Sequence, residues 1–506
     1  MSDAVGLERV SRIVGYKLTK GNYNNTTPNL PQRIAIIGEA NTPNQGVIVP
    51  DEPVQITSAQ QAGELFGYGS PIHSIMRILR PVSGGGVGGI PTVVYPQEEA
   101  DEAVAKVLTV TPTGTATGNG THTIVIAGRD GLDGVFYDVN IVQGDNAASI
   151  APKIAAVVNS VLGAPVSATS SSSAATLTAK WKGLTSNSIS VTVKTNGSDL
   201  GISYAVASPT AGSGTPSIAG ALANFGSEWN TIVVNSYGTV SSIVQALETF
   251  NGVPDPETPT GRYAGIIMKP FIALTGSVEE NPGSFTDASD RKDQVTIAIC
   301  PAPLSPGMDH EAAANMAALF ARQTQDTPHL DVASRSYPDM PTPLNIGYMA
   351  DYDNRDALVK KGCSTVDLVN GRYVVQDFVT TYHPQGETPP QFRYCRNLMI
   401  DFNVRFSYFL KEQTYVVDHA IANDNDIVSA PKVVKPKQWK QVIDQMADDL
   451  ARRALIVDAA FMKDSIDVSI SSVNPDRLET FFRYKRSGFA RISSTTAEAG
   501  FNFGNI

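Results

Sequence analysis

Cysteine is scarce in this sequence, and its scarcity excludes a disulfide-stapled fold. Only three cysteines occur among 506 residues, namely Cys300, Cys363 and Cys395, and no two of them form a CxxC pair. An odd number without paired spacing is typical of a protein that folds in a reducing compartment. We therefore expect the chain to be made in the cytosol.

Basic character and long apolar runs are also missing. Charged residues are 17% of the chain and the net charge is −10, whereas nucleic-acid coats and membrane-surface proteins need basic surfaces. No apolar run approaches the ~18 residues that a bilayer span requires. The first twenty residues lack the apolar segment of a signal peptide. We therefore expect no nucleic-acid partner, no membrane anchor and no signal peptide.

The motifs of nucleotide and hydrolase chemistry are absent. The glycine-rich run at 83–89 lacks the Lys-Ser/Thr pair that a phosphate loop needs to reach phosphates and Mg²⁺. The sequence contains no GxSxG motif, so no nucleophile elbow is indicated. Cys363 could be paired with a distant histidine such as His383, but any chain with this composition allows that. We therefore expect no enzyme activity and no cofactor.

Metal-site spacing is missing as well. None of the six histidines forms an HExxH or another paired-ligand motif. Asp351, Asp353 and Asp356 resemble the start of a calcium loop, but the sixth position should be Gly and the twelfth, Gly362, should be Glu. An acidic turn that caps the next helix explains these residues better. His73 lies off the apolar stripe of its helix, and we expect it to face solvent.

The sequence does contain a large apolar fraction rich in turn residues. Hydrophobic residues make up 42% of the chain, with 42 glycines and 32 prolines. This is more than one core usually holds, and it favours strands and turns over long helices. The prediction is a multidomain protein of the α+β or α/β class.

Alternating strand and helix patterns indicate an α/β core in two parts, residues 23–105 and 213–350. Four buried runs are expected to share one sheet, at 34–37, 92–95, 232–234 and 297–299. A further strand is expected at 263–268.

Three helix starts are indicated in this core. Ser58 and Gln61 have the spacing of a capping box, and Ser70-Pro71 places proline at the first helical position. Asp309 is expected to cap a helix over about 310–325.

A β-rich domain interrupts the core at residues 106–212, which we call the insert. Only ten charged residues occur in 109–212. Apolar residues alternate with polar ones around 137–141, 177–181 and 189–193, which is typical of half-buried strands. One helix is expected, with Ser149 as its N-cap and Gly163 at its end. We expect the insert to face outward, with few contacts to its parent domain.

An α+β domain is predicted at 351–487. Asn370-Gly371 separates two strand-like runs and is a strong hairpin signal. Two amphipathic helices follow, one over 395–409 and one over 437–458. The polar face of the second carries the residues that we expect to face a partner: Lys440, Asp444, Asp448, Arg452 and Arg453.

The two ends of the chain, 1–22 and 488–506, are predicted to be arms. Both are strand-like and too polar to bury themselves, so each is expected to pair with the open sheet edge of another chain. The ordinary alternative is frayed termini. The apolar residues expected on the arm strands are Ile13, Val14, Tyr16, Leu18, Phe489, Ile492, Phe501 and Phe503.

The arms are basic and the body is acidic. Residues 1–33 hold five basic and two acidic side chains, and residues 481–506 hold four and one, so each segment has net charge +3. The rest of the chain then carries −16. We expect this asymmetry to favour attachment of an arm to another subunit's body.

Several segments in order along the chain resemble the tail sheath family of contractile bacteriophages, closest to the Mu-like branch. They are RIAIIGEANTPNQGV at 33–47, PVQITSAQQAGELFGYGSPIHSIMRILRP at 53–81, WNTIVVNSYG at 229–238, VTIAICPAP at 295–303 and RNLMIDFNVRFSY at 396–408. The resemblance covers nearly the whole chain. No single motif is diagnostic, but their order is.

The resemblance implies a mechanical protein. Its core would be subtilisin-like in fold, but the chain lacks that fold's catalytic segments, so the activity does not follow. Sheath subunits stack as homo-hexameric rings around a tail tube, and they contract to drive the tube through the host envelope. The implied partners are itself, the tail tube protein, and the baseplate and tail terminator proteins. The implied location is the virion tail, assembled in the bacterial cytoplasm.

Other functions remain open at this point. The sequence does not separate a phage tail from a related contractile injection device or a tail-like bacteriocin. A surface protein whose insert binds carbohydrate is an alternative of a different class. A degenerate hydrolase is a third.

Overall fold

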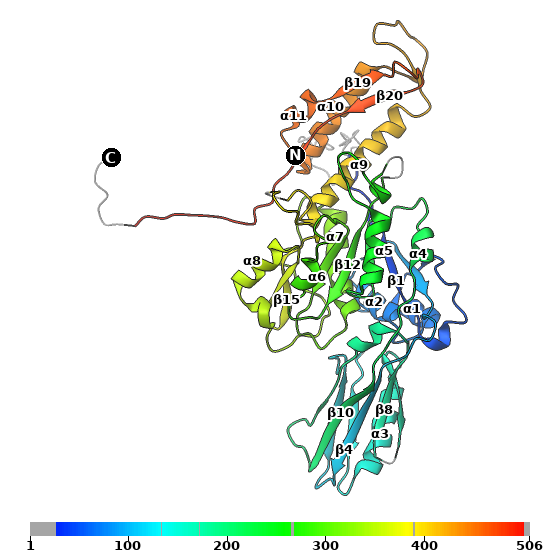
Figure 1. The fold of residues 1–506 in the computed structure, drawn as a ribbon, viewed down its shortest axis with the longest axis vertical. Coiled ribbons are helices and arrows are strands. Elements are labelled where there is room, and N and C mark those ends of the chain that lie inside the picture. Colours follow the sequence, from blue (N-terminus) through cyan, green and yellow to red (C-terminus); the bar gives the residue numbers. More distant parts are fainter. Residues whose placement is uncertain (1–26, 133, 172, 265–267, 388–389, 500–506) are drawn as a thin grey trace, which may run out of the picture.

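The computed structural model describes residues 27–132, 134–171, 173–264, 268–387 and 390–499. The molecule is elongated, with the insert at one end of its long axis and a helical layer at the other (Figure 1). The α/β core lies between them. No helix within the described ranges is long and apolar enough to cross a membrane.

The core is built on a six-stranded sheet in the order β13-β12-β11-β1-β3-β2. All neighbours are parallel except β2, which runs antiparallel to β3. The strands are β1 (Ile34–Glu39), β2 (Val54–Gln55), β3 (Thr92–Gln97), β11 (Ile232–Asn235), β12 (Ile272–Ser277) and β13 (Ile297–Pro301). The five parallel strands are buried along their whole length, as expected for a parallel sheet covered on both faces. The four predicted strands do share this sheet.

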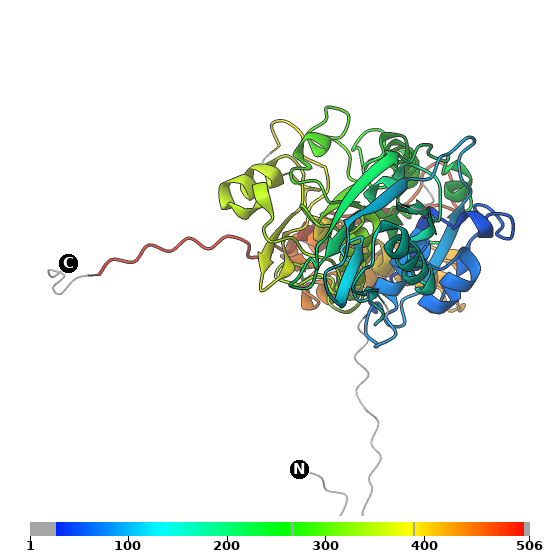
Figure 2. The same ribbon diagram turned by 90° about the horizontal axis from the view of Figure 1, so that it is seen from below.

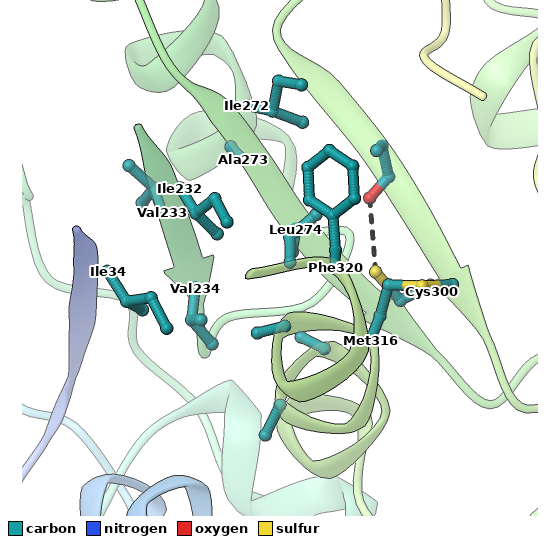
Figure 3. Close-up of a cluster of buried hydrophobic side chains, with 14 of the residues drawn as sticks. Ile34, Ile232, Val233, Val234, Ile272, Ala273, Leu274, Cys300, Met316 and Phe320 are labelled. Atoms are coloured by element: carbon teal, nitrogen blue, oxygen red, sulfur yellow. Dashed lines mark hydrogen bonds between the residues drawn. The ribbon is translucent and has the colours of Figure 1, made fainter. Parts of the chain in front are cut away.

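Helices cover both faces of the sheet. They are α1 (Ala59–Phe66), α2 (Pro71–Leu79), α4 (Ala219–Ala223), α5 (Ser241–Asn251), α6 (Gly283–Thr286) and α7 (Asp309–Asp326). Helix α7 packs so closely on β12 that a Cβ on Gly276 would lie 1.7 Å from the Asp309 carbonyl oxygen. On the opposite face, the Phe250 ring of α5 meets Phe225 edge-to-face and lies tilted against Phe271. Figure 3 shows the aliphatic centre of this core.

One predicted strand of the core is only partly covered by the described residues. Of the run at 263–268, Tyr263 ends a short 3-10 helix, Gly261–Tyr263, neither Ala264 nor Met268 is in a strand, and residues 265–267 are not described. The strand that pairs with β11 and β13 is β12, Ile272–Ser277. The helix near 310 begins at Asp309 with Met308 as its N-cap, so Asp309 is not the cap. Its carboxylate instead accepts a hydrogen bond from the Val278 amide at 2.9 Å.

The insert contains two sheets and one helix. Its sheets have the orders β10-β4-β8-β7 and β6-β5-β9. Its elements are β4 (Val107–Gly114), β5 (Gly120–Ile126), β6 (Tyr137–Ile141), α3 (Ala147–Ser160), β7 (Val166–Ser170), β8 (Ala175–Ala179), β9 (Val191–Lys194) and β10 (Ile202–Thr210). The N-cap of α3 is Asn146 rather than Ser149. Ser149 is the reciprocal member of that capping box, and the helix ends before Gly163.

A hairpin and a helix continue the core sheet's hydrophobic cluster beyond residue 351. The elements are α8 (Tyr352–Lys360), β14 (Thr365–Val369), β15 (Arg372–Asp377) and the first half of α9 (Cys395–Tyr415). Asn370 and Gly371 form the turn with φ of 51° and 70°, as a two-residue hairpin requires. Asp351 caps α8, which confirms the acidic turn. Val366, Phe378 and Leu398 belong to the core cluster, so no separate core begins at residue 351.

A third cluster forms around the second half of α9. It includes α10 (Pro436–Arg452), α11 (Ala459–Asp464) and five short strand segments. These are β16 (Ala420–Ile421), β17 (Val433–Val434), β18 (Ile456–Val457), β19 (Asp467–Ile470) and β20 (Leu478–Phe481), and β18 pairs with β21 (Lys485–Arg486). Helix α10 is six residues shorter than predicted at its C-terminal end, because Ala454 has φ of 54° and Val457 is in a strand.

Candidate functional site

Chemistry-bearing side chains do not converge in the described part of the chain. Within it, no group of three or more His, Cys, Asp and Glu could hold a metal ion. His73, expected to face solvent, is buried at 4% exposure, and its Nδ1 accepts a hydrogen bond from the Gly69 amide at 3.2 Å. The candidate functional features are the places where the chain's two ends leave the body and where the insert meets the core.

Residues 27–33, which we call the strap, connect helices α9 and α10 to the core. The Thr27 amide donates to Asp449 on α10 at 3.2 Å, and the Leu30 amide donates to Asn403 on α9 at 2.9 Å. The Asn29 side chain donates to the carbonyl oxygens of Gln325 and Asp326 at the end of α7. The strap therefore connects three helices before the chain enters β1.

Arg453 is part of this joint and is not a free surface residue. Its guanidinium donates to Asn29 at 2.8 Å and to Ser407 at 3.2 Å, and it pairs with Asp449 at 3.5 Å. The side chain is 11% exposed. Burial is the main influence on Arg453 and lowers its pKa, while Asp449 opposes that effect. Its predicted role on a partner-facing surface is contradicted by these contacts.

The remaining predicted residues of α10 divide into two groups. Lys440 is half-buried and donates to the Ile466 carbonyl at 2.9 Å, and Asp444 is also half-buried. Asp448 and Arg452 are exposed, and Asp448 pairs with Lys463 at 2.6 Å. Asp448 and Arg452 are thus the two exposed members of the predicted set.

The root of the C-terminal arm is bound to α9 by arginine. The Arg486 guanidinium makes two hydrogen bonds of 2.7 Å to Asp401. Arg396 donates to the Ser487 carbonyl at 2.8 Å and stacks over Phe489 at 5.7 Å. Bidentate, charge-assisted contacts of this kind fix geometry as well as adding stability. Phe489, expected on an intermolecular strand, therefore rests partly buried on its own subunit.

Arg491 makes the last contact between the arm and the body. It pairs with the buried carboxylate of Asp331 and lies 3.6 Å from the ring centre of Tyr394. The next residue, Ile492, is 88% exposed. From there to residue 499 the backbone runs away from the body without regular secondary structure (Figures 1 and 2).

Six predicted arm residues lie outside the described residues, namely Ile13, Val14, Tyr16, Leu18, Phe501 and Phe503. Most of the basic charge that we assigned to the C-terminal arm is neutralised within the subunit. Lys485 pairs with Asp458 at 2.6 Å, Arg486 with Asp401, and Arg491 with Asp331. The expectation that these charges attract a neighbour's body is therefore wrong for this arm.

A buried ion cluster joins the insert to the core. Arg129 follows β5 of the insert and contacts Glu311 of α7 at 2.9 Å and Asp339 at 3.0 Å, and Arg77 of α2 contacts Glu311 at 3.2 Å. Burial would raise the pKa of Glu311, but the two guanidinium charges lower it to about 2. The carboxylate is therefore ionised inside the protein.

A second polar link crosses the same seam. The Trp181 indole donates to Thr185 at 2.8 Å, and the Thr185 hydroxyl donates to Glu39 at the end of β1 at 2.6 Å. Burial raises the pKa of Glu39 to about 8, against the effect of the Thr185 hydrogen bond, and the charge of Glu99 adds to the rise. With Met308 inside the insert's own apolar cluster, these contacts contradict the expectation that the insert has few contacts with its parent.

The sheet edges differ in protection. The edge strand β7 of the insert is covered in part by Asn159. The Asn159 side chain accepts a hydrogen bond from the Ala168 amide at 2.9 Å and donates one to the Ala168 carbonyl at 2.7 Å. Among the residues that the structure describes, the β19–β20 hairpin pairs only with itself, and every residue of its two strands is half-exposed or exposed. An uncovered edge of this kind can accept another strand.

Comparison with known proteins shows similarity to a tail sheath protein. No family model matches the chain. The chain is 22% identical over 438 residues to the Mu-like prophage FluMu tail sheath protein of Haemophilus influenzae, which covers 84% of this chain and 85% of that protein. This similarity confirms the predicted resemblance to tail sheath proteins of the Mu-like branch.

Two solved structures are also similar at low sequence identity. One is the crystal structure of the sheath tail protein from Desulfitobacterium hafniense, with a TM-score of 0.43, 11% identity, and coverage of 93% of this chain and 100% of that chain. The other is the cryo-EM structure of the anti-feeding prophage baseplate in the contracted state, with a TM-score of 0.45, 11% identity, and coverage of 97% and 100%.

Proposed function

We propose that this chain is the sheath subunit of a contractile phage tail or of a related injection device. The observation that carries the proposal is the similarity to a tail sheath protein along most of both chains. The arm that leaves the body after Arg491 adds support, because an exposed extended segment needs a partner to become ordered.

In this proposal the subunits polymerise as stacked homo-hexameric rings around a tail tube. The arms, residues 1–22 and 488–506, pair with neighbouring subunits, and the open edges of the β19–β20 hairpin are suited to receive a strand. The other partners are the tube protein and the baseplate and tail terminator proteins. Contraction drives the tube through the host envelope, and the protein resides in the virion tail after assembly in the bacterial cytoplasm.

We also propose the domain division that the sequence indicated. The core comprises 23–105 and 213–350 and the insert 106–212. The C-terminal α+β segment 351–487 begins with a hairpin that packs in the hydrophobic cluster of the core, and its own cluster forms around the second half of α9. A subtilisin-like relationship of the core is part of the proposal, and the parallel sheet with helices on both faces is compatible with it. Fold likeness alone does not bring the hydrolase activity.

The mechanical function needs no enzyme activity and no cofactor. A carbohydrate-binding surface protein is the alternative of a different class, and a tail-like bacteriocin or other injection device is the alternative of the same class. A carbohydrate-binding protein would remain as discrete particles with or without sugar. The sheath of a phage tail and the sheath of a related injection device would both form polymers.

Electron microscopy of the purified full chain tests the proposal. A sheath subunit, concentrated without any tube protein, is expected to form long hollow tubes of constant diameter. Discrete monomers at all concentrations, together with specific retention on a glycan array, would contradict the proposal and favour the carbohydrate-binding alternative.

A further inference from the structure

The hairpin turn at Asn370-Gly371 is one of four Asn-Gly pairs in the sequence, and the others begin at Asn119, Asn196 and Asn251. Asparagine is among the thermolabile residues of proteins. When glycine follows it, the glycine nitrogen can attack the side-chain amide of the asparagine, because glycine has no Cβ to hinder the approach. The fate of each pair therefore depends on how firmly the fold holds the asparagine side chain.

Asn370 is the least restrained of the four. It is exposed, and among the described residues its side chain has no hydrogen-bond partner. Gly371 is exposed as well, and no described atom beyond its chain neighbours lies within 4 Å of the position that a Cβ would take. The turn is closed by the pairing of Val369 with Arg372 and by a hydrogen bond of 3.2 Å from the Thr342 hydroxyl to the Gly371 carbonyl. The attacked side chain is thus free to turn toward the backbone.

Asn196 provides a close comparison within the same chain. It is exposed and has φ of 51°, as Asn370 has, and a glycine with positive φ follows in both turns. The Asn196 side chain, however, donates to the Thr121 carbonyl at 3.0 Å and to the Thr123 hydroxyl at 2.9 Å. Both bonds must break before the side chain can turn toward the backbone. Two bonds of ordinary net strength slow the attack about tenfold.

The other two pairs are also restrained. The Asn119 side chain accepts a hydrogen bond from the Gln143 amide at 2.8 Å. Asn251 is fully buried, and its side chain donates to the Phe271 carbonyl at 3.0 Å and accepts from the Phe271 amide at 2.9 Å. The Gly252 amide donates to a carbonyl of α5 at 2.8 Å, so the attacking nitrogen of this pair is itself hydrogen-bonded.

We propose that Asn370 is a site of spontaneous covalent modification, at which water converts the side-chain amide to a carboxylate. The Gly371 nitrogen bonds to Cγ of Asn370 and gives up its proton, and the Cγ–Nδ2 bond breaks so that Nδ2 leaves as ammonia. Water then opens the resulting succinimide ring at either carbonyl, which yields aspartate or isoaspartate. One water is consumed and one ammonia is released. The inference goes beyond the proposed function and does not depend on polymerisation.

The modification changes the hairpin in two ways. A neutral side chain becomes a carboxylate, and in isoaspartate the main chain passes through the side chain and is one methylene longer. Because the turn fixes the register of the two strands, the longer backbone strains the pairing of Val369 with Arg372. The strands of this hairpin contribute Val366, Tyr373 and Val375 to the core cluster. The modified protein is therefore expected to be more acidic and less stable.

Peptide mapping of the stored full chain by mass spectrometry tests the site. After several weeks at neutral pH and physiological temperature, conversion at Asn370 should exceed that at Asn196 about tenfold, with the least at Asn251. The chain stored in guanidinium chloride is the reference, since unfolding removes the hydrogen bonds and should bring the four pairs to similar rates. Absence of conversion at Asn370 when the unfolded chain has reacted would overturn the proposal. Equal rates at Asn370 and Asn196 in the folded chain would do the same.

Two matched variants connect the site to its consequence. Asn370→Gly cannot react and keeps a turn sequence that two-residue hairpins accept. Its storage should therefore generate less of the acidic species on anion exchange and leave the melting temperature unchanged. Asn196→Gly removes a restrained pair instead, and on storage it should acidify and lose stability as wild type does. As much acidic species in Asn370→Gly as in wild type would place the reactive site elsewhere and contradict the proposal.

Discussion

Arg129 Nε lies 2.9 Å from Oε1 of Glu311, and this ion pair joins the insert to the core inside the protein. Glu311 has no exposed side-chain surface. A buried charge without partners is costly, and removal of one partner exposes that cost. The pair therefore makes the insert and α7 depend on each other for stability.

Replacing Arg129 should destabilise the protein strongly. In Arg129→Met, Glu311 keeps Arg77 as a partner, so the loss is expected at or just below the lower end of the range of about 3–5 kcal/mol for a broken buried pair. Urea unfolding measures it. Lys194→Met removes an exposed pair with Asp130 on the same domain, and its effect should stay below about 1 kcal/mol. Equal effects of the two variants would contradict the role of the buried cluster.

Glu39 should make the protein less stable as pH rises. Its pKa is about 8 in the folded state against 4.5 ordinarily, so the folded state holds a proton more tightly than the unfolded state. The stabilisation is complete below about pH 4.5 and is lost as pH rises through about 8. Glu39→Gln, which cannot ionise, should gain thermal stability over wild type as pH increases from 5 to 8. If the difference in melting temperature between wild type and Glu39→Gln were the same at pH 5 and pH 8, Glu39 would already be ionised in the folded protein at pH 5.

The two arginines at the end of α10 should behave differently. Arg453→Glu places an acid in the joint beside buried Asp449 and should lower stability by about 3–5 kcal/mol. Arg452 is exposed, so Arg452→Glu should leave the melting temperature within about a degree, as surface substitutions usually do. If α10 contacts the tube, Arg452→Glu should weaken binding of the tube protein in a co-sedimentation assay. Unchanged co-sedimentation would remove α10 from the tube interface.

Two truncations of the C-terminal arm should separate folding from assembly. A chain that ends at Arg491 keeps its arginine contacts and should be a stable monomer that does not polymerise. A chain that ends at Ser487 also loses Arg491, leaves Asp331 buried without its guanidinium partner, and should melt at a lower temperature. Analytical ultracentrifugation and calorimetry distinguish the two outcomes. Normal tubes from the chain that ends at Arg491 would contradict the arm mechanism.

The sequence predicted strands well where the flanking residues mark the limits of an apolar run. It predicted them less well where two short apolar runs follow one another and either could be the strand. The runs at 263–268 and Ile272–Ser277 are both short, apolar and free of alternation. A strand buried on both faces has no polar side, so periodicity alone could not choose between these runs. Only the parallel pairing of β12 with both β11 and β13 decides it.

Burial contributed by distant segments was not predictable from local patterns. His73 lies off the stripe of α2, but α2 packs against α1 and α7 on its sides, and the insert approaches it near Gly163 and Pro165. The same limit applies to Arg453, whose partners Asn29 and Ser407 are far away in the sequence. A helical wheel assigns such residues to solvent, because it contains no information about the rest of the fold.

The strap and the root of the C-terminal arm are both bound to one helix. Asn403 of α9 receives the Leu30 amide of the strap, and Asp401 and Arg396 of α9 hold the C-terminal root at Arg486 and Ser487. In a polymer joined by its arms, tension applied to either arm would reach α9, together with α10 and α7 at the strap and Asp331 at the C-terminal root. None of these contacts lies in the insert, so the insert could vary in size or sequence without altering the strength of the connection between subunits.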